Sequence, residues 1–297
     1  MQLVEQQAIR RVPRHAFNRL GLDVFGCAVH IAGSSLALAL LERNFDLLQR
    51  TGRARADLYY RVSFDDRARR FFIIRAGQPP LAAADDGEFL YLFEKDLTVE
   101  LQRFRRDLYF VHAAALEFAG KAILLVAPSG QGKSTTAWGL LQHGFGYMTD
   151  ELAAVDLRRM AVAGYSHALC LKQRPPGGYP LPTKTLRTAR TLHVPASLLR
   201  KPAARAPLPL GAILFVAYGG MVAPRMKPLG KAEAAAHLFV QALNPLAHAE
   251  DGLEGADRIV CNAACFKLRS GDLKATCELV KKTLESVASA GLRYASA

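Results

Sequence analysis

A glycine-rich loop between a predicted strand and a predicted helix constrains the fold of this chain more than any other feature. The apolar run "AILLV" (122–126) precedes "APSGQGKS" (127–134), and "STTAWGLLQH" (134–143) follows. A strand, a glycine-rich loop and a helix in this order are typical of α/β folds, in which strands and helices alternate. We therefore predict an α/β domain whose sheet contains the strand before the loop.

The loop fits the pattern of a phosphate-binding P-loop, with Ala127 in place of the first glycine. Gly130 and Gly132 allow successive backbone amides to point at one anion, and the following helix adds the positive end of its dipole. In such loops the lysine reaches the β- and γ-phosphates, and the serine hydroxyl is a ligand of Mg²⁺. We expect ATP and Mg²⁺ as cofactors, with Lys133 and Ser134 in these two roles. The expected nucleotide-binding residues are Ser129, Gly130, Gln131, Gly132, Lys133, Ser134 and Thr135.

Two acidic residues, Asp150 and Glu151, follow the loop after only one short helix. Gly144 ends this helix, and "FGYMT" (145–149) is predicted to be a short strand that ends at the acidic pair. If this strand lies beside the strand before the loop, its end places both carboxylates next to the phosphates. One carboxylate can then hold Mg²⁺, and the other can accept the proton of an attacking hydroxyl. An ordinary acidic turn is the alternative interpretation.

His112 lies in "YFVHAAALEF" (109–118), which we predict to be a strand joined by a tight turn to the strand before the loop. Taken alone, a histidine in such a strand is more often a buried core residue than a functional one.

The segments "VHAAALEFAGKAILLVAPSGQGKS" (111–134) and "GFGYMTDELAAVD" (144–156) resemble the HPr kinase/phosphorylase family and the HPr-kinase-related kinases. These families share a fold with phosphoenolpyruvate carboxykinases, and the resemblance continues more weakly to about residue 285. It implies an α/β P-loop kinase domain of this type over residues 106–297. In that fold a single helix links the P-loop to the acidic strand, which accounts for the short spacing.

The resemblance also implies roles for individual residues. Asp150 corresponds to the catalytic base, Glu151 to the acid linked to the metal, and His112 to the histidine beside them, which would orient Asp150 or tune its pKa. Lys172 and Arg174 correspond to basic residues at the root of a mobile loop, where they would contact the substrate. The stretch "ALCLKQRPPGG" (168–178) departs from the signature of HPr kinases. The implied acceptor is therefore a serine of another protein or peptide, such as the precursor peptide of a natural product.

Residues 1–105 are predicted to form a small α+β domain that could bind the peptide acceptor. Its alternating and helical apolar patterns predict three strand regions, two of which form a hairpin around "DDRA" (65–68), and two helices. The expected strands are within 20–33, 57–64 and 69–76, and the expected helices are 34–50 and 86–108.

The second half of the chain continues the alternation of strands and helices. The stretch "KQRPPGGYPLPTKTLRTAR" (172–190) contains too many prolines and glycines for a regular element, and we predict a lid. After it we expect strands at 211–218 and 257–270 and helices at 230–244 and 272–290, with Asp272 as a helix cap.

The net charge of +13 is concentrated in one part of the chain. Between Asp156 and Glu233 there is no acidic residue, whereas this interval contains 13 lysines and arginines. Such a field attracts phosphates, nucleic acid or an acidic peptide, although it can also be an ordinary solvated face. The stretch lacks the interleaved aromatic residues of a single-strand-binding surface, which argues against nucleic acid. We expect an acidic peptide or protein as the acceptor.

The five cysteines form no C-x-x-C pair and do not predict a metal site. No segment resembles a signal peptide, and the most apolar stretch is too short and too interrupted to span a membrane. We therefore expect a cytoplasmic protein without a membrane partner. The sequence leaves open whether the chain forms a homo-oligomer.

Together, these features predict a Mg²⁺/ATP-dependent kinase that phosphorylates a hydroxyl group, with a serine of a peptide or protein as the expected acceptor. Two alternatives remain open at this point. The acceptor could be a small molecule, or the chain could be a nucleotide-responsive binding module without transfer chemistry.

Overall fold

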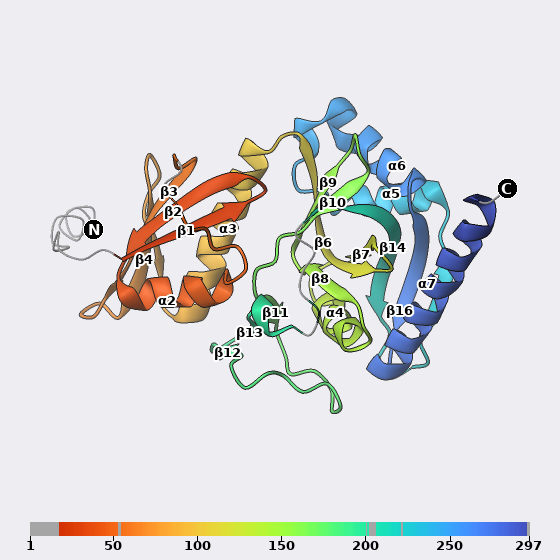
Figure 1. Cartoon of the computed structure of the whole chain (residues 1–297). Helices are drawn as coiled ribbons and strands as arrows, with labels where there is room; N and C mark the ends of the chain where they lie inside the picture. The colour runs from red at the N-terminus through yellow and green to blue at the C-terminus, as the bar shows by residue number, and fades with distance from the viewer. Residues whose placement is uncertain (1–17, 53–54, 200, 202–205, 221, 296–297) are drawn as a thin grey trace.

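The computed structural model describes residues 18–52, 55–199, 201, 206–220 and 222–295. Within these residues the chain is a mixed α/β protein with three β-sheets (Figure 1). A five-stranded sheet and a larger eight-stranded sheet lie side by side, and a small three-stranded sheet lies below and between them in this view.

The five-stranded sheet has the strand order β1-β2-β3-β4-β5. Its first hairpin turns at Phe25 and Gly26, which both have positive φ, so the single strand region predicted from the sequence is in fact two strands. The β3–β4 hairpin forms where the alternating pattern predicts it. The strands are β1 (Asn18–Val24), β2 (Cys27–Gly33), β3 (Leu58–Asp65), β4 (Arg70–Arg75) and β5 (Leu81–Ala83).

Two helices, α2 (Ser35–Asn44) and α3 (Asp86–Phe104), pack on this sheet. Helix α3 begins where Asp85 accepts a hydrogen bond from the backbone N–H of Glu88 at 2.8 Å, an N-cap that satisfies one free donor. The apolar core below these helices also contains Phe110, Leu152 and Tyr165 from the larger sheet region. The N-terminal sheet is therefore not an isolated unit, because it shares its core with the segments that carry the predicted site.

The eight-stranded sheet has the order β10-β9-β6-β7-β14-β16-β15, with β8 paired to β6. Strands β7, β14 and β16 are parallel, and the other pairs are antiparallel. The strands are β6 (Leu108–Phe118), β7 (Lys121–Val126), β8 (Gly146–Thr149), β9 (Leu152–Asp156), β10 (Ala161–Ala163), β14 (Leu208–Tyr218), β15 (Arg225–Pro228) and β16 (Ala264–Ser270).

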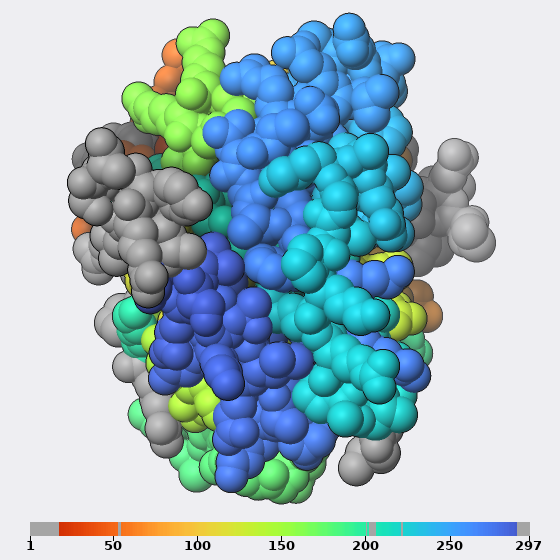
Figure 2. Space-filling model, turned by 90° about the vertical axis from the view of Figure 1, so that its right-hand side faces the viewer, coloured from red at the N-terminus to blue at the C-terminus, as the bar shows by residue number. Residues whose placement is uncertain are grey.

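Helices cover both faces of this sheet. Residues of α4 (Lys133–Gln142) and α7 (Leu273–Ala295) share one apolar core with the sheet, whereas α5 (Lys231–Phe239) and α6 (Leu253–Cys261) share another. Figure 2 shows that the segments after β14 make up most of the face seen from the right of Figure 1. The short 3₁₀ helices are η1 (Ala196–Leu198), η2 (Pro245–Ala247) and η3 (Ala249–Gly252).

Strand β8 does not lie beside the strand before the loop, as the sequence predicted. It pairs with β6, and β6 pairs with β7 through its other edge. Strands β8 and β9 both run antiparallel along β6, and Asp150 and Glu151 occupy the break between them. The acidic pair therefore faces the loop across β6, since β6 is the middle strand.

The basic stretch 172–190 is mostly irregular, as its prolines and glycines predict, but it is also packed. Tyr179 is buried, its carbonyl accepts a hydrogen bond from Trp138 Nε1 at 3.2 Å, and its hydroxyl lies 2.9 Å from His143 Nε2. The middle of the stretch is thus anchored on α4. Near its end lies β12 (Leu186–Arg187), which belongs to a small sheet with β11 (Leu169–Leu171) and β13 (Leu192–Val194), the strands that flank the stretch.

Two predictions for the C-terminal region need correction. The helix predicted at 230–244 ends at Phe239, and residues 257–261 belong to α6 rather than to a strand. The predicted cap of α7 is present, because Asp272 Oδ1 accepts a hydrogen bond from the N–H of Ala275 at 2.9 Å. None of the helices in the described part of the chain is long and apolar enough to cross a bilayer.

Candidate functional site

The glycine-rich loop, Ala127–Ser134, leaves the carboxyl end of β7. The parallel strands β14 and β16 end at the same edge of the sheet. A Cβ atom placed on Gly132 would lie 3.8 Å from Cβ of Tyr218 and 3.9 Å from Oγ of Ser270. These two residues are the last of β14 and β16. The loop therefore lies in the crevice at the carboxyl ends of parallel strands, which is where open α/β sheets bind ligands.

The backbone of the loop requires glycine at two positions. Gly130 has φ +85° and Gly132 has φ +81°, and both values are in the left-handed region that other residues rarely adopt. Helix α4 begins directly after Gly132, and no side chain of the described residues caps it. The first N–H groups of a helix have no partner within the helix and carry its positive dipole end. The start of α4 is therefore open to an anion.

Lys133 gives a second sign of an anion site. Its side chain is 6% exposed, and Nζ has no hydrogen-bond partner among the described residues. Burial lowers the pKa of this lysine, whereas the nearby charges of Glu151 and Asp150 raise it. An ammonium group that is buried without a partner is costly unless a ligand supplies one. A phosphate group at the start of α4 would be such a ligand.

Lys172 reaches the loop from the root of the basic stretch. Its Nζ donates a hydrogen bond to Oγ of Ser129 at 2.7 Å. Arg174 lies instead at the rim of a separate hollow of about 330 Å³, which Arg187 also lines. The structure thus brings one of the two predicted basic residues into contact with the loop and places the other farther along the stretch.

Asp150 is held in a fixed position by two hydrogen bonds. Its side chain is 1% exposed, Oδ1 accepts from the hydroxyl of Tyr147 at 2.8 Å, and Oδ2 accepts from the backbone N–H of Cys170 at 2.8 Å. Burial, and then the charge of Glu151, raises the pKa of Asp150 to about 7, against the lowering effect of both hydrogen bonds. A carboxylate with a pKa near neutrality suits a general base.

Glu151 is half-exposed and contacts His112. Its Oε1 lies 3.2 Å from Nε2 of His112, whose Nδ1 lies 3.3 Å from Oε1 of Gln241. Desolvation would raise the pKa of Glu151, but the contact with His112 and the charge of Lys133 outweigh this effect and lower it. We expected His112 to lie beside the two acids and to orient Asp150 or tune its pKa; the contact in the structure is with Glu151.

Two residues that the sequence analysis did not identify extend the polar cluster around Asp150: His167 contacts Asp150, and Glu94 contacts His167. His167 Nε2 is 3.3 Å from Asp150 Oδ1 and 3.2 Å from Glu94 Oε1, and the side chain of His167 is 2% exposed. The angles do not make regular hydrogen bonds, so Glu94 Oε1 and both His167 nitrogens lack such a partner among the described residues. Glu94 therefore extends the buried polar cluster from α3 to Asp150.

A signal for Glu94 is present in the sequence. Helix α3 buries Leu90, Leu97 and Leu101 on one face, and Glu94 occupies the position of that face between the first two. A carboxylate in an apolar stripe is a candidate functional residue, because burial of a charge requires a partner. His167, in "AGYSHALCL" (163–171), has no comparable signal.

The site thus combines an open helix start, a buried lysine and two carboxylates whose environments differ. Asp150 is buried and has a raised pKa, whereas Glu151 is half-exposed and has a lowered pKa. Two such carboxylates can have separate roles, one as a proton acceptor and the other as a permanent anion. In the described part of the chain, no three His, Cys, Asp or Glu side chains cluster in a way that could hold a metal ion.

No protein-family model matches this chain, and no curated protein matches it. Among solved structures, the Hpr(Ser) kinase/phosphatase from Coxiella burnetii is similar with a TM-score of 0.31 and 12% sequence identity. This similarity covers 62% of the present chain and 98% of the other.

Proposed function

We propose that this protein is a Mg²⁺/ATP-dependent kinase that transfers the γ-phosphoryl group to a hydroxyl, with a serine of a peptide or protein as the acceptor. The observation that carries the proposal is the buried Nζ of Lys133 at the open start of α4, which has no hydrogen-bond partner among the residues that the structure describes. The charges of Asp150 and Glu151 act on this same lysine. The sequence resemblance to HPr kinases supports the same function.

In this proposal the loop binds the phosphates. The amides from Ser129 to Thr135 and the ammonium of Lys133 would stabilise the negative charge of the transferring group. Ser134 and Glu151 would hold Mg²⁺ with water and phosphate oxygens, because hard cations prefer oxygen ligands. When bound, Mg²⁺ neutralises charge on the phosphates and orients them. The lowered pKa of Glu151 keeps this carboxylate ionised for that role.

Asp150 would accept the proton of the acceptor hydroxyl. As the hydroxyl oxygen bonds to the γ-phosphorus, the bond from this phosphorus to the β–γ bridging oxygen breaks, and ADP leaves. The proton of the hydroxyl moves to a carboxylate oxygen of Asp150. Tyr147 and the N–H of Cys170 hold this carboxylate in place, so it needs no rearrangement before it accepts the proton.

The division into an acceptor-binding part, 1–105, and a kinase part, 106–297, remains a proposal. We infer that the acceptor approaches Asp150 from the side of α3, because Glu94 of that helix belongs to the same polar cluster. The basic stretch would attract an acidic acceptor, and Lys172 links its root to the phosphate-binding loop.

The proposal is tested by incubation of the protein with γ-labelled ATP, Mg²⁺ and the peptides or proteins encoded beside its gene. We expect label on a serine of one of them. Label on a small molecule alone would identify a small-molecule kinase. Tight ATP binding without transfer to any acceptor would instead indicate a binding module.

A further inference from the structure

Four exposed cations lie together at the outer edge of the large sheet, and we refer to them as the β15–β16 cluster. Its members are Arg225, Lys227, Lys267 and Arg269. In the register of the two strands each cation of β15 lies directly opposite a cation of β16, Arg225 against Arg269 and Lys227 against Lys267. Directly opposite residues share one face of a sheet, so the four charges lie on the same face.

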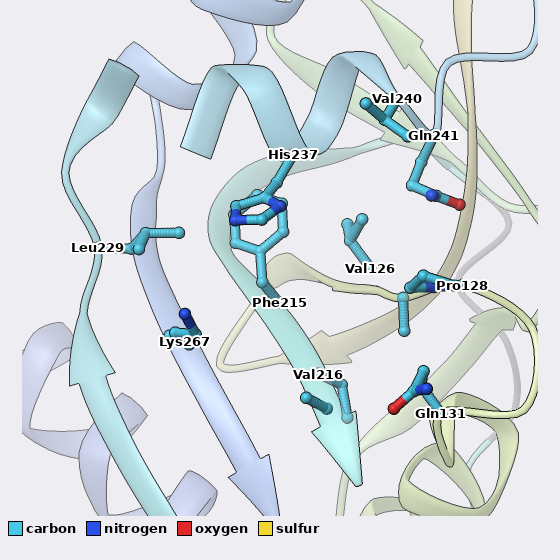
Figure 3. A pocket seen from close by; sticks show the side chains of 12 residues that line it. Val126, Pro128, Gln131, Phe215, Val216, Leu229, His237, Val240, Gln241 and Lys267 are labelled. Carbon is cyan, nitrogen blue, oxygen red and sulfur yellow. The ribbon is translucent and has the colours of Figure 1, made fainter. Parts of the chain in front are cut away.

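This face is the one that α5 partly covers. Met226 and Leu268, which alternate with the cations, pack on the other face, in the core shared with α4 and α7. Lys267 lies 3.8 Å from Glu233 of α5, and Figure 3 shows it on β16, between Leu229 and Phe215. The other three cations have no ion pair and no side-chain hydrogen bond with any residue that the structure describes.

The paired cations cost stability in the absence of a ligand, since like charges directly opposite each other on neighbouring strands repel. Cations on an edge strand can serve to prevent pairing with another chain. That role does not account for the cluster, because two of its members are on β16, which is paired on both sides. Pro224 and Pro228 also flank the edge already, and neither has an N–H to offer an added strand. An anionic ligand would instead relieve the repulsion.

The cluster begins beside the glycine-rich loop. Lys267 is level with the last residue of β7 in the register of the three parallel strands. Arg269 is followed by Ser270, whose Oγ lies 3.9 Å from a Cβ atom placed on Gly132 of the loop. A Cβ atom on Gly219 would lie 2.5 Å from Nε of Arg269, so this glycine leaves the space that the arginine occupies. The cluster is thus at the edge of the sheet where the phosphates would bind.

The cluster is separate from the basic stretch 172–190. Tyr179 anchors that stretch on α4, on one face of the sheet, whereas the cluster lies on the other face. Between the break that holds Asp150 and strand β16 there are four strand spacings, which correspond to about 19 Å. An extended chain bound at both places would span this distance with about six residues. A peptide can therefore reach both Asp150 and the cluster.

The spacing of the four charges suits several carboxylates rather than one small anion. Opposite residues on paired strands are about 5 Å apart, and residues two apart along a strand are about 7 Å apart. A run of acidic side chains can contact all four positions. Nucleic acid fits less well, because it favours exposed aromatic side chains on which bases stack. On β14, β15 and β16 the exposed aromatic residue is Tyr218, and alternation places it on the other face.

We propose that the β15–β16 cluster binds an acidic segment of the peptide or protein acceptor. This inference rests on the proposed kinase function and adds where the acceptor is held and what chemistry it carries there. The cluster attracts the acidic segment, which leaves the serine free to reach Asp150 on the other side of the loop.

The test measures binding of a defined probe without nucleotide. Fluorescence anisotropy compares a labelled oligoglutamate peptide with an oligoglutamine peptide of equal length, at low and at physiological ionic strength. The cluster variant combines Arg225→Gln with Lys227→Gln. The matched control combines Lys274→Gln with Lys282→Gln on α7, which removes two exposed cations and lowers the net charge equally.

We expect the wild-type protein to bind the glutamate peptide and not the glutamine peptide. The cluster variant should bind the glutamate peptide about fivefold or more weakly at low ionic strength, with a weaker dependence on salt, whereas the control should change less than about twofold. Without ligand, the cluster variant should have a higher Tm than the control, because repulsion is relieved. Arg269→Gln removes one cation of β16 and provides a second variant if the first does not fold.

Equal losses in the cluster and control variants, or equal binding of the two peptides by the wild-type protein, would overturn the acidic-segment site and leave the kinase function standing. A parallel loss of affinity for ATP with Mg²⁺ in the cluster variant would assign these cations to the nucleotide and also overturn it. So would tighter binding of a single-stranded oligonucleotide of equal charge that the cluster variant loses. If the wild-type protein binds the glutamate peptide through the cluster but does not bind ATP, the proposed kinase function fails and the site for acidic peptides stands.

Discussion

The carboxylate of Glu94 lies 3.2 Å from the imidazole of His167, and this contact connects helix α3 to the buried Asp150. The same imidazole nitrogen lies 3.3 Å from Asp150 Oδ1. Tyr147, three residues before Asp150, donates a hydrogen bond to it, and His167 lies on the other side of the carboxylate. Glu94 of the N-terminal region contacts His167 in turn. If Asp150 is the general base, the N-terminal region contributes directly to its position.

The first prediction concerns the rate of transfer in Glu94→Gln. Loss of this carboxylate removes the charge beside His167, so the position of His167 against Asp150 is less well defined. We therefore expect kcat to fall about 10–100-fold, as for other residues that orient a functional group. The KM for ATP should not change, because Lys133 and the loop are untouched. Steady-state kinetics with labelled ATP measures both.

The matched control is Asp96→Asn on the same helix. Asp96 accepts hydrogen bonds from Tyr60 and Arg75, so its loss should lower stability without an effect on kcat. A fall in kcat of the same size in both variants would mean that Glu94 has only a structural role.

The second prediction is a change in the pH dependence of stability. The pKa of Glu94 is raised to about 7, first by burial and then by Asp150 and Glu151, although His167 lowers it in part. Between its ordinary pKa near 4.5 and about 7, the folded state binds more protons at Glu94 than the unfolded state. The contribution of Glu94 to stability is therefore present at low pH and is lost as the pH rises through this window.

Glutamine cannot ionise, so Glu94→Gln should gain stability relative to the wild-type protein as the pH rises from 5 to 8. The gain should be on the order of 2–3 kcal/mol, from about 1.4 kcal/mol for each unit of pKa shift. Urea denaturation at several pH values measures the free energy of unfolding. A difference between the two proteins that stays constant with pH would contradict the raised pKa.

The third prediction separates function from stability at Lys133. Lys133→Met keeps most of the side-chain volume and removes a buried ammonium that has no hydrogen-bond partner in the described part of the chain, so the ligand-free protein should become more stable by about 1–3 kcal/mol. Phosphoryl transfer should fall by several orders of magnitude, because the charge that stabilises the phosphates is lost. Denaturation without nucleotide and a transfer assay test the two parts; destabilisation would show that Lys133 supports the fold.

The fourth prediction assigns different roles to the two acids. Asp150→Asn should keep binding of ATP and Mg²⁺ but abolish transfer, since only the proton acceptor is removed. Glu151→Gln should mainly raise the Mg²⁺ concentration needed for half-maximal activity. Undiminished transfer in Asp150→Asn would exclude this residue as the base, and an unchanged Mg²⁺ requirement in Glu151→Gln would exclude a metal ligand.

The fifth prediction concerns the basic stretch as a lid. Neutralisation of Lys184, Arg187 and Arg190 should raise the KM for an acidic acceptor and weaken its salt dependence, because these charges attract it over a distance that salt screens. Neutralisation of Lys172, which contacts Ser129, should lower kcat instead. An unchanged acceptor KM in the triple variant would leave the stretch as a solvated face.

Limited proteolysis offers a second test of the lid. Tyr179 anchors the stretch on α4, so we expect cleavage near Arg174 and Lys184 but not at the anchor, and protection when ATP and acceptor bind. The variant Tyr179→Ala should make the whole stretch sensitive. Equal cleavage with and without ligands would contradict closure.

The sequence by itself determined the elements whose causes are local. The glycines at 130 and 132, the helix that starts at Lys133 and the hairpins β3–β4 and β6–β7 follow from backbone preferences and apolar periodicity, which act over a few residues. The same local signals predicted the irregular basic stretch, because prolines and glycines exclude regular elements wherever they occur.

Only the tertiary structure decided which of these residues meet. It paired β8 with β6, placed His112 beside Glu151 and brought Glu94 and His167 to Asp150. Each of these contacts joins residues that are far apart in the chain or on different strands, and each depends on how sheets and helices pack to bury apolar surface. A charged residue in an apolar stripe, such as Glu94, shows that a partner is needed, but packing alone determines which partner it finds.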